Sequence, residues 1–179
     1  MIILITGVPG TGKTSIAKEL VKLLKGKELD LLELSKKYKN ITGYDEEKNS
    51  FIVNEYRISA MIQKEVKNSK DIFIIASHLS HFVKPSLTKL CVVLRCNPNE
   101  LRKRLKKRGY DKNKIDENVM CEYLDTCLIE ALDVGHKRHL HEIDTTNKNP
   151  KNVAKEIVDI LNRKKEKSYG KIKWLEDKI

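Results

Sequence analysis

The chain has 179 residues, the size of one ordinary domain with a single core, and its 8 Gly and 4 Pro exclude a collagen-like or linker protein. Hydrophobic residues make up 40% of the chain and charged residues 34%, and no apolar run reaches the roughly 18 residues that a membrane-spanning helix needs. The net charge of +11 favours phosphate-bearing or acidic partners, such as nucleotides or RNA, and the alternative from charge alone is a lysine-rich surface that has no target.

The first residues, 1–6, are apolar, but no basic segment precedes them and no small-residue cleavage site follows. They are therefore not predicted to be a signal peptide. We expect one domain over residues 1–179, located in the cytoplasm, without a membrane partner. The four cysteines lack the spacing of a zinc knuckle and are expected to be reduced thiols; they are Cys91, Cys96, Cys121 and Cys127.

Short apolar runs alternate with amphipathic stretches along the chain. Strands are predicted at residues 2–6, 28–32, 71–76, 90–95 and 139–145. Helices are predicted at 13–25, 54–67, 98–109 and 114–134, and a last one from Pro150, which follows Asn149 as a helix start. Strands that are apolar throughout and separated by helices predict an α/β fold: a five-stranded parallel sheet with helices on both faces.

The basic C-terminal segment, residues 162–179, holds seven basic and three acidic residues and the single tryptophan, Trp174. It is predicted to be a helix docked on the domain, and the alternative is a basic arm that reaches for RNA. Three histidines before and within the last predicted strand, His136, His139 and His141, invite a zinc interpretation. No cysteine or acid at ligand spacing joins them, so a polar strand start is the preferred interpretation.

One motif carries the functional argument. The segment 7–14, Gly-Val-Pro-Gly-Thr-Gly-Lys-Thr, fits the phosphate-loop pattern G-x-x-x-x-G-K-[ST], and it stands between a predicted strand and a predicted helix. Such a loop cradles phosphates with its backbone N–H groups. Lys13 is expected to reach the β- and γ-phosphates of ATP and Thr14 to hold Mg²⁺. The nucleotide-binding residues are predicted to be Gly10, Gly12, Lys13, Thr14, Ser15 and Arg108.

The rest of the sequence favours a small kinase among the P-loop classes. No D-x-x-G switch of a GTPase occurs, and Asn147-Lys148-Asn149 is followed by Pro150 where a GTPase has Asp. A basic run that ends at Gly109-Tyr110 fits a short lid over about residues 107–118, which would neutralise charge on a transferring phosphoryl group. Arg108 is the preferred catalytic residue of this run, ahead of Arg104; the alternative is a solvated helix face that also includes Arg102.

Several further motifs resemble those of a known family, the adenylate-kinase-like NTPases that include the coilin-interacting nuclear ATPase and its archaeal relatives. The resemblance covers residues 1 to about 161 and keeps the order of the motifs. The most specific match is the Arg-Gly-Tyr of the lid followed by Glu-Asn-Val. The matching segments are Gly43-Tyr44-Asp45-Glu46-Glu47, Ser77-His78, Lys107-Arg108-Gly109-Tyr110, Glu117-Asn118-Val119 and Cys121-Glu122.

The resemblance implies a nucleoside monophosphate kinase of broad specificity, often favouring AMP, that also has ATPase activity. It further implies a role in late maturation of the small ribosomal subunit, through transient binding to ribosomal protein uS11, and a contact with rRNA is compatible with the basic charge. The alternative is an ATPase switch that loads or releases uS11 and has little kinase activity.

The same resemblance places the acceptor nucleotide along about residues 30–53, the NMP-binding segment, with Glu33 and Lys36 at positions where the family has a carboxylate and often an arginine. It makes His78 a catalytic candidate beside Lys13 and Arg108, with the role of positioning a water or a phosphate. For His81 a structural role is preferred.

Two departures from the family pattern stand out. Ala76-Ser77 replaces the carboxylate that should end the third strand and hold Mg²⁺ through water. Thr14 is then the expected protein ligand, with phosphates and water completing the shell or Glu33 substituting. The segment Asn54-Glu55-Tyr56 is less acidic than in the family.

Overall fold

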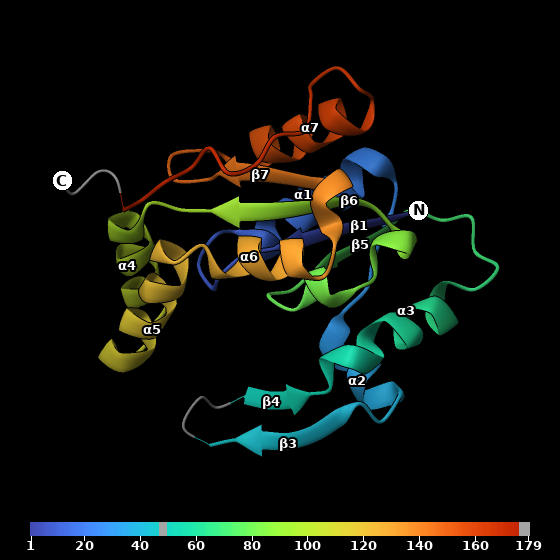
Figure 1. The fold of residues 1–179 in the computed structure, drawn as a ribbon, viewed down its shortest axis with the longest axis horizontal. Coiled ribbons are helices and arrows are strands. Elements are labelled where there is room, and N and C mark those ends of the chain that lie inside the picture. Colours follow the sequence, from blue (N-terminus) through green and yellow to red (C-terminus); the bar gives the residue numbers. More distant parts are fainter. Residues whose placement is uncertain (47–49, 176–179) are drawn as a thin grey trace.

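A five-stranded parallel sheet forms the centre of the fold (Figure 1). The computed structural model describes residues 1–46 and 50–175. The strand order is β2-β5-β1-β6-β7, and every neighbouring pair is parallel. The prediction of this sheet is confirmed. The strands are β1 (Ile2–Thr6), β2 (Lys27–Glu28), β5 (Phe73–Ala76), β6 (Thr88–Arg95) and β7 (Leu140–Asp144).

Helices cover both faces of the sheet, because alternate residues of the strands are apolar on both sides. On one face, α1 (Lys13–Leu24) and α7 (Pro150–Leu161) pack against side chains such as Ile3 and Val92. On the other face, α3 (Ile58–Val66) and α6 (Thr126–Asp133) pack against side chains such as Leu4.

The insert between β2 and α3 departs from the prediction. The strand predicted over 28–32 exists as β2 but is shorter: pairing ends after Glu28, and α2 (Leu31–Lys37) begins three residues later. The cause is Asp30, whose carboxylate accepts hydrogen bonds from the N–H groups of Leu32 (2.7 Å) and Glu33 (3.2 Å) and so caps the helix. An antiparallel hairpin of β3 (Ile41–Asp45) and β4 (Ser50–Val53) follows, then the short helix η1 (Glu55–Arg57).

The single long helix predicted over 114–134 is wrong. After α4 (Pro98–Lys107), two helices occupy this range: α5 (Lys112–Tyr123) and α6. The break between them falls at Asp125, whose φ is 55°. An ion pair between Asp125 and the buried Arg95 accompanies this turn. Three further short helices are η2 (Ser80–Phe82), η3 (Pro85–Leu87) and η4 (His136–Arg138).

The C-terminal segment docks on the domain, but not as the predicted helix. Its described part runs without helix or strand back across β7 toward α4 and α5 (Figure 1). The N–H of Ser168 donates to His141 Nδ1 at 2.9 Å, and the N–H of Glu142 donates to the carbonyl of Ser168 at 2.9 Å. Backbone hydrogen bonds therefore fix a segment that has too few apolar residues for an amphipathic helix.

The four cysteines are free, and Cys91 and Cys96 are buried. Among the described residues, no helix has the length and apolar character needed to cross a membrane.

Candidate active site

The loop between β1 and α1 has a shape that depends on glycine. Gly7 and Gly10 have φ angles of 136° and 92°. A Cβ on Gly7 would lie 2.5 Å from the carbonyl oxygen of Leu94, and a Cβ on Gly10 would lie 2.7 Å from the Leu101 side chain. Glycine at these positions lets the chain curl tightly into the first turn of α1. The unpaired N–H groups and the dipole of that turn favour an anion.

Lys13 stands at the start of α1 and folds back over the loop. Its Nζ donates to the carbonyl oxygens of Gly7 (2.6 Å) and Val8 (3.0 Å). Burial lowers the pKa of Lys13 to about 8; Cys127 and Glu122 oppose this shift and Arg108 adds to it. A phosphate that displaced the two carbonyl groups would bring the negative charge that favours the ammonium form. Thr14 and Ser15 are exposed on the same turn.

Arg104 of α4 forms hydrogen bonds with the main chain of the phosphate loop and of the segment after β7. Its guanidinium donates to the carbonyl oxygens of Gly10 (3.5 Å) and Thr145 (3.1 Å), and it pairs with Glu100 at 3.0 Å. The Thr145 hydroxyl in turn donates to the carbonyl of Thr11 at 2.9 Å. Because its guanidinium nitrogens already donate to these groups, Arg104 holds the loop in place and is not expected to contact a phosphate.

Arg102 and Arg108, two arginines of the basic run in α4 and at its C-cap, differ in their partners. Arg102 pairs with Asp116 across α4 and α5, and Arg108 makes no ion pair with any residue in the described parts of the chain. Arg108 is exposed at the end of α4, and its charge contributes to the lowered pKa of Lys13. Gly109, with a φ of 76°, then turns the chain toward α5. The charge of Arg108 is therefore near enough to Lys13 to disfavour its ammonium form.

An apolar pocket of about 430 Å³ opens between the insert and the carboxyl end of β5. Leu31 of α2, Tyr44 of β3 and Phe51 of β4 line it, together with Ser77 and His78. The Tyr44 and Phe51 rings meet edge to face, with centroids 5.3 Å apart. Flat apolar walls with a few hydroxyl groups suit a nucleobase and its sugar.

His78 links this pocket to the phosphate loop. It is the second residue after β5 and is exposed in the pocket wall. Desolvation by the surrounding protein lowers the pKa of His78 to about 4, and the positive charge of Lys13 adds to that shift. The imidazole is therefore neutral at pH 7, and it stands within the electrostatic reach of the phosphate-loop lysine.

The residues around the loop fit a magnesium ion that is held mainly by phosphates. Ala76 ends β5, and Glu33, the suggested substitute, pairs with Lys36 at 2.8 Å on the exposed side of α2. In residues 1–46 and 50–175, no group of three or more His, Cys, Asp or Glu is placed to hold a metal. The hydroxyl oxygen of Thr14 is then the protein group that would bind the metal. Phosphate and water, which Mg²⁺ readily keeps as ligands, would fill the other positions.

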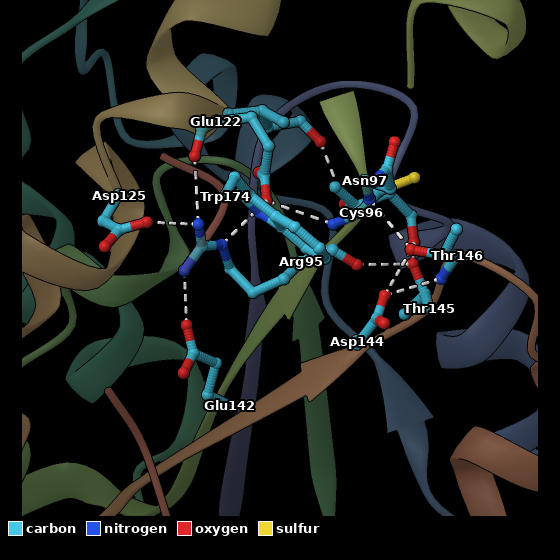
Figure 2. Close-up of polar contacts among 12 residues, drawn as sticks. Arg95, Cys96, Asn97, Glu122, Asp125, Glu142, Asp144, Thr145, Thr146 and Trp174 are labelled. Atoms are coloured by element: carbon cyan, nitrogen blue, oxygen red, sulfur yellow. Dashed lines mark hydrogen bonds and ion pairs between the residues drawn. The ribbon is translucent and has the colours of Figure 1, made fainter. Parts of the chain in front are cut away.

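A buried charge cluster that no sequence motif predicted is centred on Arg95 at the end of β6 (Figure 2). Arg95 is 2% exposed and pairs with Glu122 of α5 at 2.7 Å, with Glu142 of β7 and with Asp125. Burial opposes the charged form of Arg95, but the three carboxylates raise its pKa on balance. The one sequence signal is an arginine that ends an otherwise apolar strand.

Trp174 closes this cluster from the C-terminal segment. Its Nε1–H donates to Glu122 at 2.8 Å, and its ring lies 5.9 Å from the Arg95 guanidinium. The N–H of Gly170 donates to Glu142 at 2.9 Å. The negative charge of Glu122 also raises the pKa of Lys13. The residue that Trp174 contacts therefore acts on the lysine of the phosphate loop.

The side chains of His81, His136 and His141 contact neighbouring elements of the fold. His81 is fully buried, with Nδ1 2.7 Å from the Thr6 hydroxyl and Nε2 3.1 Å from Glu130. His136 bonds the carbonyl of His81 at 2.9 Å. His139 precedes β7, so it does not share a strand face with His141 as expected. These partners agree with the structural role preferred for His81.

Comparison with known proteins places these features in a family. Residues 3–125 match a family model described as AAA domain. The chain is 39% identical over 176 residues to a protein named "Putative adenylate kinase" from Methanocaldococcus jannaschii, covering 98% of this chain and 94% of the relative. A protein of the same name from Pyrococcus furiosus is 37% identical over 176 residues, covering 97% and 91%.

Solved structures share the fold at low sequence identity. A shikimate kinase from Acinetobacter baumannii, solved with shikimate, has a TM-score of 0.61 and 18% identity, covering 93% of this chain and 95% of the other. A gluconokinase from Sinorhizobium meliloti has a TM-score of 0.58 and 14% identity, covering 90% and 91%. These likenesses show that the chain shares its fold with the two solved structures.

Proposed function

The chain belongs to the AAA-domain family of P-loop proteins and to the group of its archaeal relatives named "Putative adenylate kinase", and from that membership we propose that it transfers the terminal phosphate of ATP to a nucleoside monophosphate. One observation carries the proposal. The apolar pocket opens at the carboxyl end of β5, beside β1, the strand that leads into the phosphate loop, and the charge of Lys13 contributes to the lowered pKa of His78 in the pocket wall. Such a pocket provides a place for an acceptor whose phosphate meets the donor.

The roles of the residues follow from their positions. Lys13 and the N–H groups of Gly10, Gly12, Thr14 and Ser15 hold the phosphates of ATP. Arg108 closes over the transferring phosphoryl group and neutralises the charge that develops on it. Neutral His78 donates a hydrogen bond that orients the acceptor phosphate. Phosphoryl transfer between nucleotides needs no covalent intermediate with the protein. Most of the rate acceleration therefore comes from positioning the two nucleotides and from neutralising charge.

Mg²⁺ bound to the ATP phosphates supplies further charge neutralisation. On the protein side, Thr14 would hold it through its hydroxyl. The acceptor that we propose first is AMP, because of the relatives' names and because Tyr44 and Phe51 offer stacking surfaces for a base. Residues 30–53 remain our proposal for the acceptor segment and 107–118 for the lid, in one domain that works in the cytoplasm.

The test compares two lysine variants of α1. Lys13→Ala removes the phosphate contact, and Lys18→Ala, exposed on the same helix, serves as the matched control. We expect formation of ADP from ATP and AMP to fall by at least about a hundredfold in Lys13→Ala and by less than about twofold in Lys18→Ala, with unchanged circular dichroism. Wild-type rates in the Lys13 variant would refute the assignment.

A second function is favoured by one observation, the alanine at the end of β5. Without a carboxylate there, Mg²⁺ is held less firmly, and slow turnover suits an ATPase switch that controls a partner. The resemblance suggests ribosomal protein uS11 as that partner, with a role in maturation of the small ribosomal subunit and contact with rRNA. A pull-down with uS11 in the presence of ATP, of ADP or of neither tests this; retention that ignores the nucleotide would count against a switch.

A further inference from the structure

A second pocket lies at the opposite end of the sheet from the phosphate loop. It has a volume of about 230 Å³ and is formed where β6 and β7 begin and α7 ends. In Figure 1 the arrowheads of β6 and β7 point toward α4 and α5, and the starts of both strands lie at the other end. The floor is apolar, formed by Leu90, Ile160 and Leu161. Nothing in the kinase proposal uses this end of the molecule.

The wall of this pocket is strongly basic. Lys89, Arg138, Arg163 and Lys167 line it, together with His139. No carboxylate lines the pocket in the described parts of the chain, and none there forms an ion pair with any of these four cations. One has a polar partner within the pocket: the ammonium of Lys167 donates to the carbonyl oxygen of Arg138.

Neither acidic side chain of α7, Glu156 or Asp159, lines the pocket, and among the described residues neither forms an ion pair with its four cations. Glu156 is already shared between Lys148 at 3.1 Å and Lys165. Glu166 is exposed in the C-terminal segment and is not part of the pocket. Four like charges around an apolar floor repel one another, and this arrangement is stabilised when an anion binds among them.

More cationic side chains lie in and beside this pocket than a single phosphate group would contact. Lys137 and Lys164 are exposed and adjoin the lining residues in sequence, so that three separate chain segments contribute. Together these side chains form the basic surface, which consists of Lys89, Lys137, Arg138, Arg163, Lys164 and Lys167. A chain of phosphates fits such a strip better than a single phosphate does, and the apolar floor with His139 offers a contact for a sugar or an unstacked base.

We propose that the basic surface binds the phosphodiester backbone of a single-stranded nucleic acid, with one nucleotide seated over Leu90, Ile160 and Leu161. Binding there leaves the phosphate loop free for ATP, since the two sites lie at opposite ends of the sheet. The C-terminal segment then has two parts: residues 163–167 present charge, and residues 168–174 anchor that charge to the domain.

The test uses fluorescence anisotropy with a labelled single-stranded RNA of about 20 nucleotides, at salt concentrations between about 50 and 200 mM. Saturating Mg-ATP keeps the phosphate loop occupied. The variant is Lys89→Gln with Arg138→Gln, and the matched control, Lys67→Gln with Lys70→Gln, removes two exposed charges after α3. Neither pair touches the proposed catalytic residues, so kinase activity reports that both variants are folded.

We expect the first variant to bind RNA at least about tenfold more weakly at the lowest salt, with a salt slope shallower by about 1.4 for two lost phosphate contacts. The control should change affinity by less than about twofold. Equal weakening in both variants would reduce the effect to net charge and overturn the proposal, as would absence of RNA binding. Binding to phosphatidylglycerol vesicles without RNA binding would overturn it in favour of a lipid surface.

Discussion

At the scale of single residues, the lowered pKa of Lys13 is the feature with the most direct consequence. In the free protein Lys13 loses its proton near pH 8 because burial disfavours the ammonium. Bound phosphates bring negative charge, so the pKa of Lys13 must be higher in the complex. Nucleotide binding above pH 8 therefore requires uptake of a proton, whereas binding at pH 7 finds Lys13 already charged.

We expect the affinity for Mg-ATP to be nearly constant from pH 6.5 to about 7.5 and to fall by up to about tenfold per pH unit above pH 8, until the pKa of the complex is reached. Calorimetric titrations in buffers of different ionisation enthalpy check the cause. At pH 9 the measured enthalpy should vary with the buffer as for uptake of nearly one proton, and at pH 7 it should not. The same buffer dependence at both pH values would contradict this account.

Arg108 gives a second prediction at this scale. Its guanidinium makes no ion pair with any described residue, and its charge contributes to the lowered pKa of Lys13, so Arg108→Ala should lower kcat by about 10²–10³-fold with a small change in the KM for ATP. The neighbouring Lys107→Ala, also exposed, is the matched control and should retain activity within about twofold. Equal losses in the two variants would show that only the general charge of the lid matters.

At the scale of elements, the β3–β4 hairpin determines whether a base can bind. Removing the Phe51 ring should raise the KM for AMP by about tenfold, because stacking of a base on an aromatic ring contributes roughly 1–3 kcal/mol. The KM for ATP should change by less than about twofold. Ile52→Ala is the control, since Ile52 is similarly exposed on the same strand but does not line the pocket. A Phe51→Ala enzyme with an unchanged KM for AMP would remove the pocket from the acceptor site.

The elements also show where local sequence patterns decide the structure and where they do not. The phosphate loop, β1 and α1 could be predicted because a continuous apolar run, a glycine pattern and helical periodicity follow one another there. The break at Asp125 could not, because its ion pair with Arg95 joins residues that are 30 positions apart in sequence. The strand predicted over 28–32 was too long because the capping hydrogen bonds of Asp30 take precedence over the apolar run that follows it.

At the scale of the whole molecule, the C-terminal segment is part of the folded domain. Trp174→Phe keeps a ring over Arg95 but removes the hydrogen bond to the buried Glu122, a charged acceptor, which costs roughly 1.5–3 kcal/mol. For a chain of this length, Tm should fall by about 3–10 °C. Lys171→Gln, an exposed change in the same segment, should leave Tm unchanged in differential scanning calorimetry. If the two variants have the same Tm, Trp174 contributes nothing to stability.

The phosphate-loop part of the candidate site could be predicted from the sequence, whereas the parts that depend on long-range contacts could not. Lys13, Thr14 and Ser15 follow from one contiguous motif, and their placement needs only the strand and helix beside them. The pocket of Tyr44 and Phe51, the supporting role of Arg104 and the cluster around Arg95 depend on side chains that meet only in the folded chain. Neither periodicity nor spacing specifies such meetings.

Transfer of a labelled phosphate tests the central claim most directly. The protein is incubated with Mg-ATP labelled at the γ-phosphate and with AMP, and the labelled products are separated by chromatography. We expect the label in the β-phosphate of ADP, in proportion to the AMP consumed, and no such product with Lys13→Ala. Label found only in inorganic phosphate, whichever nucleoside monophosphate is added, would contradict the kinase and leave an ATPase.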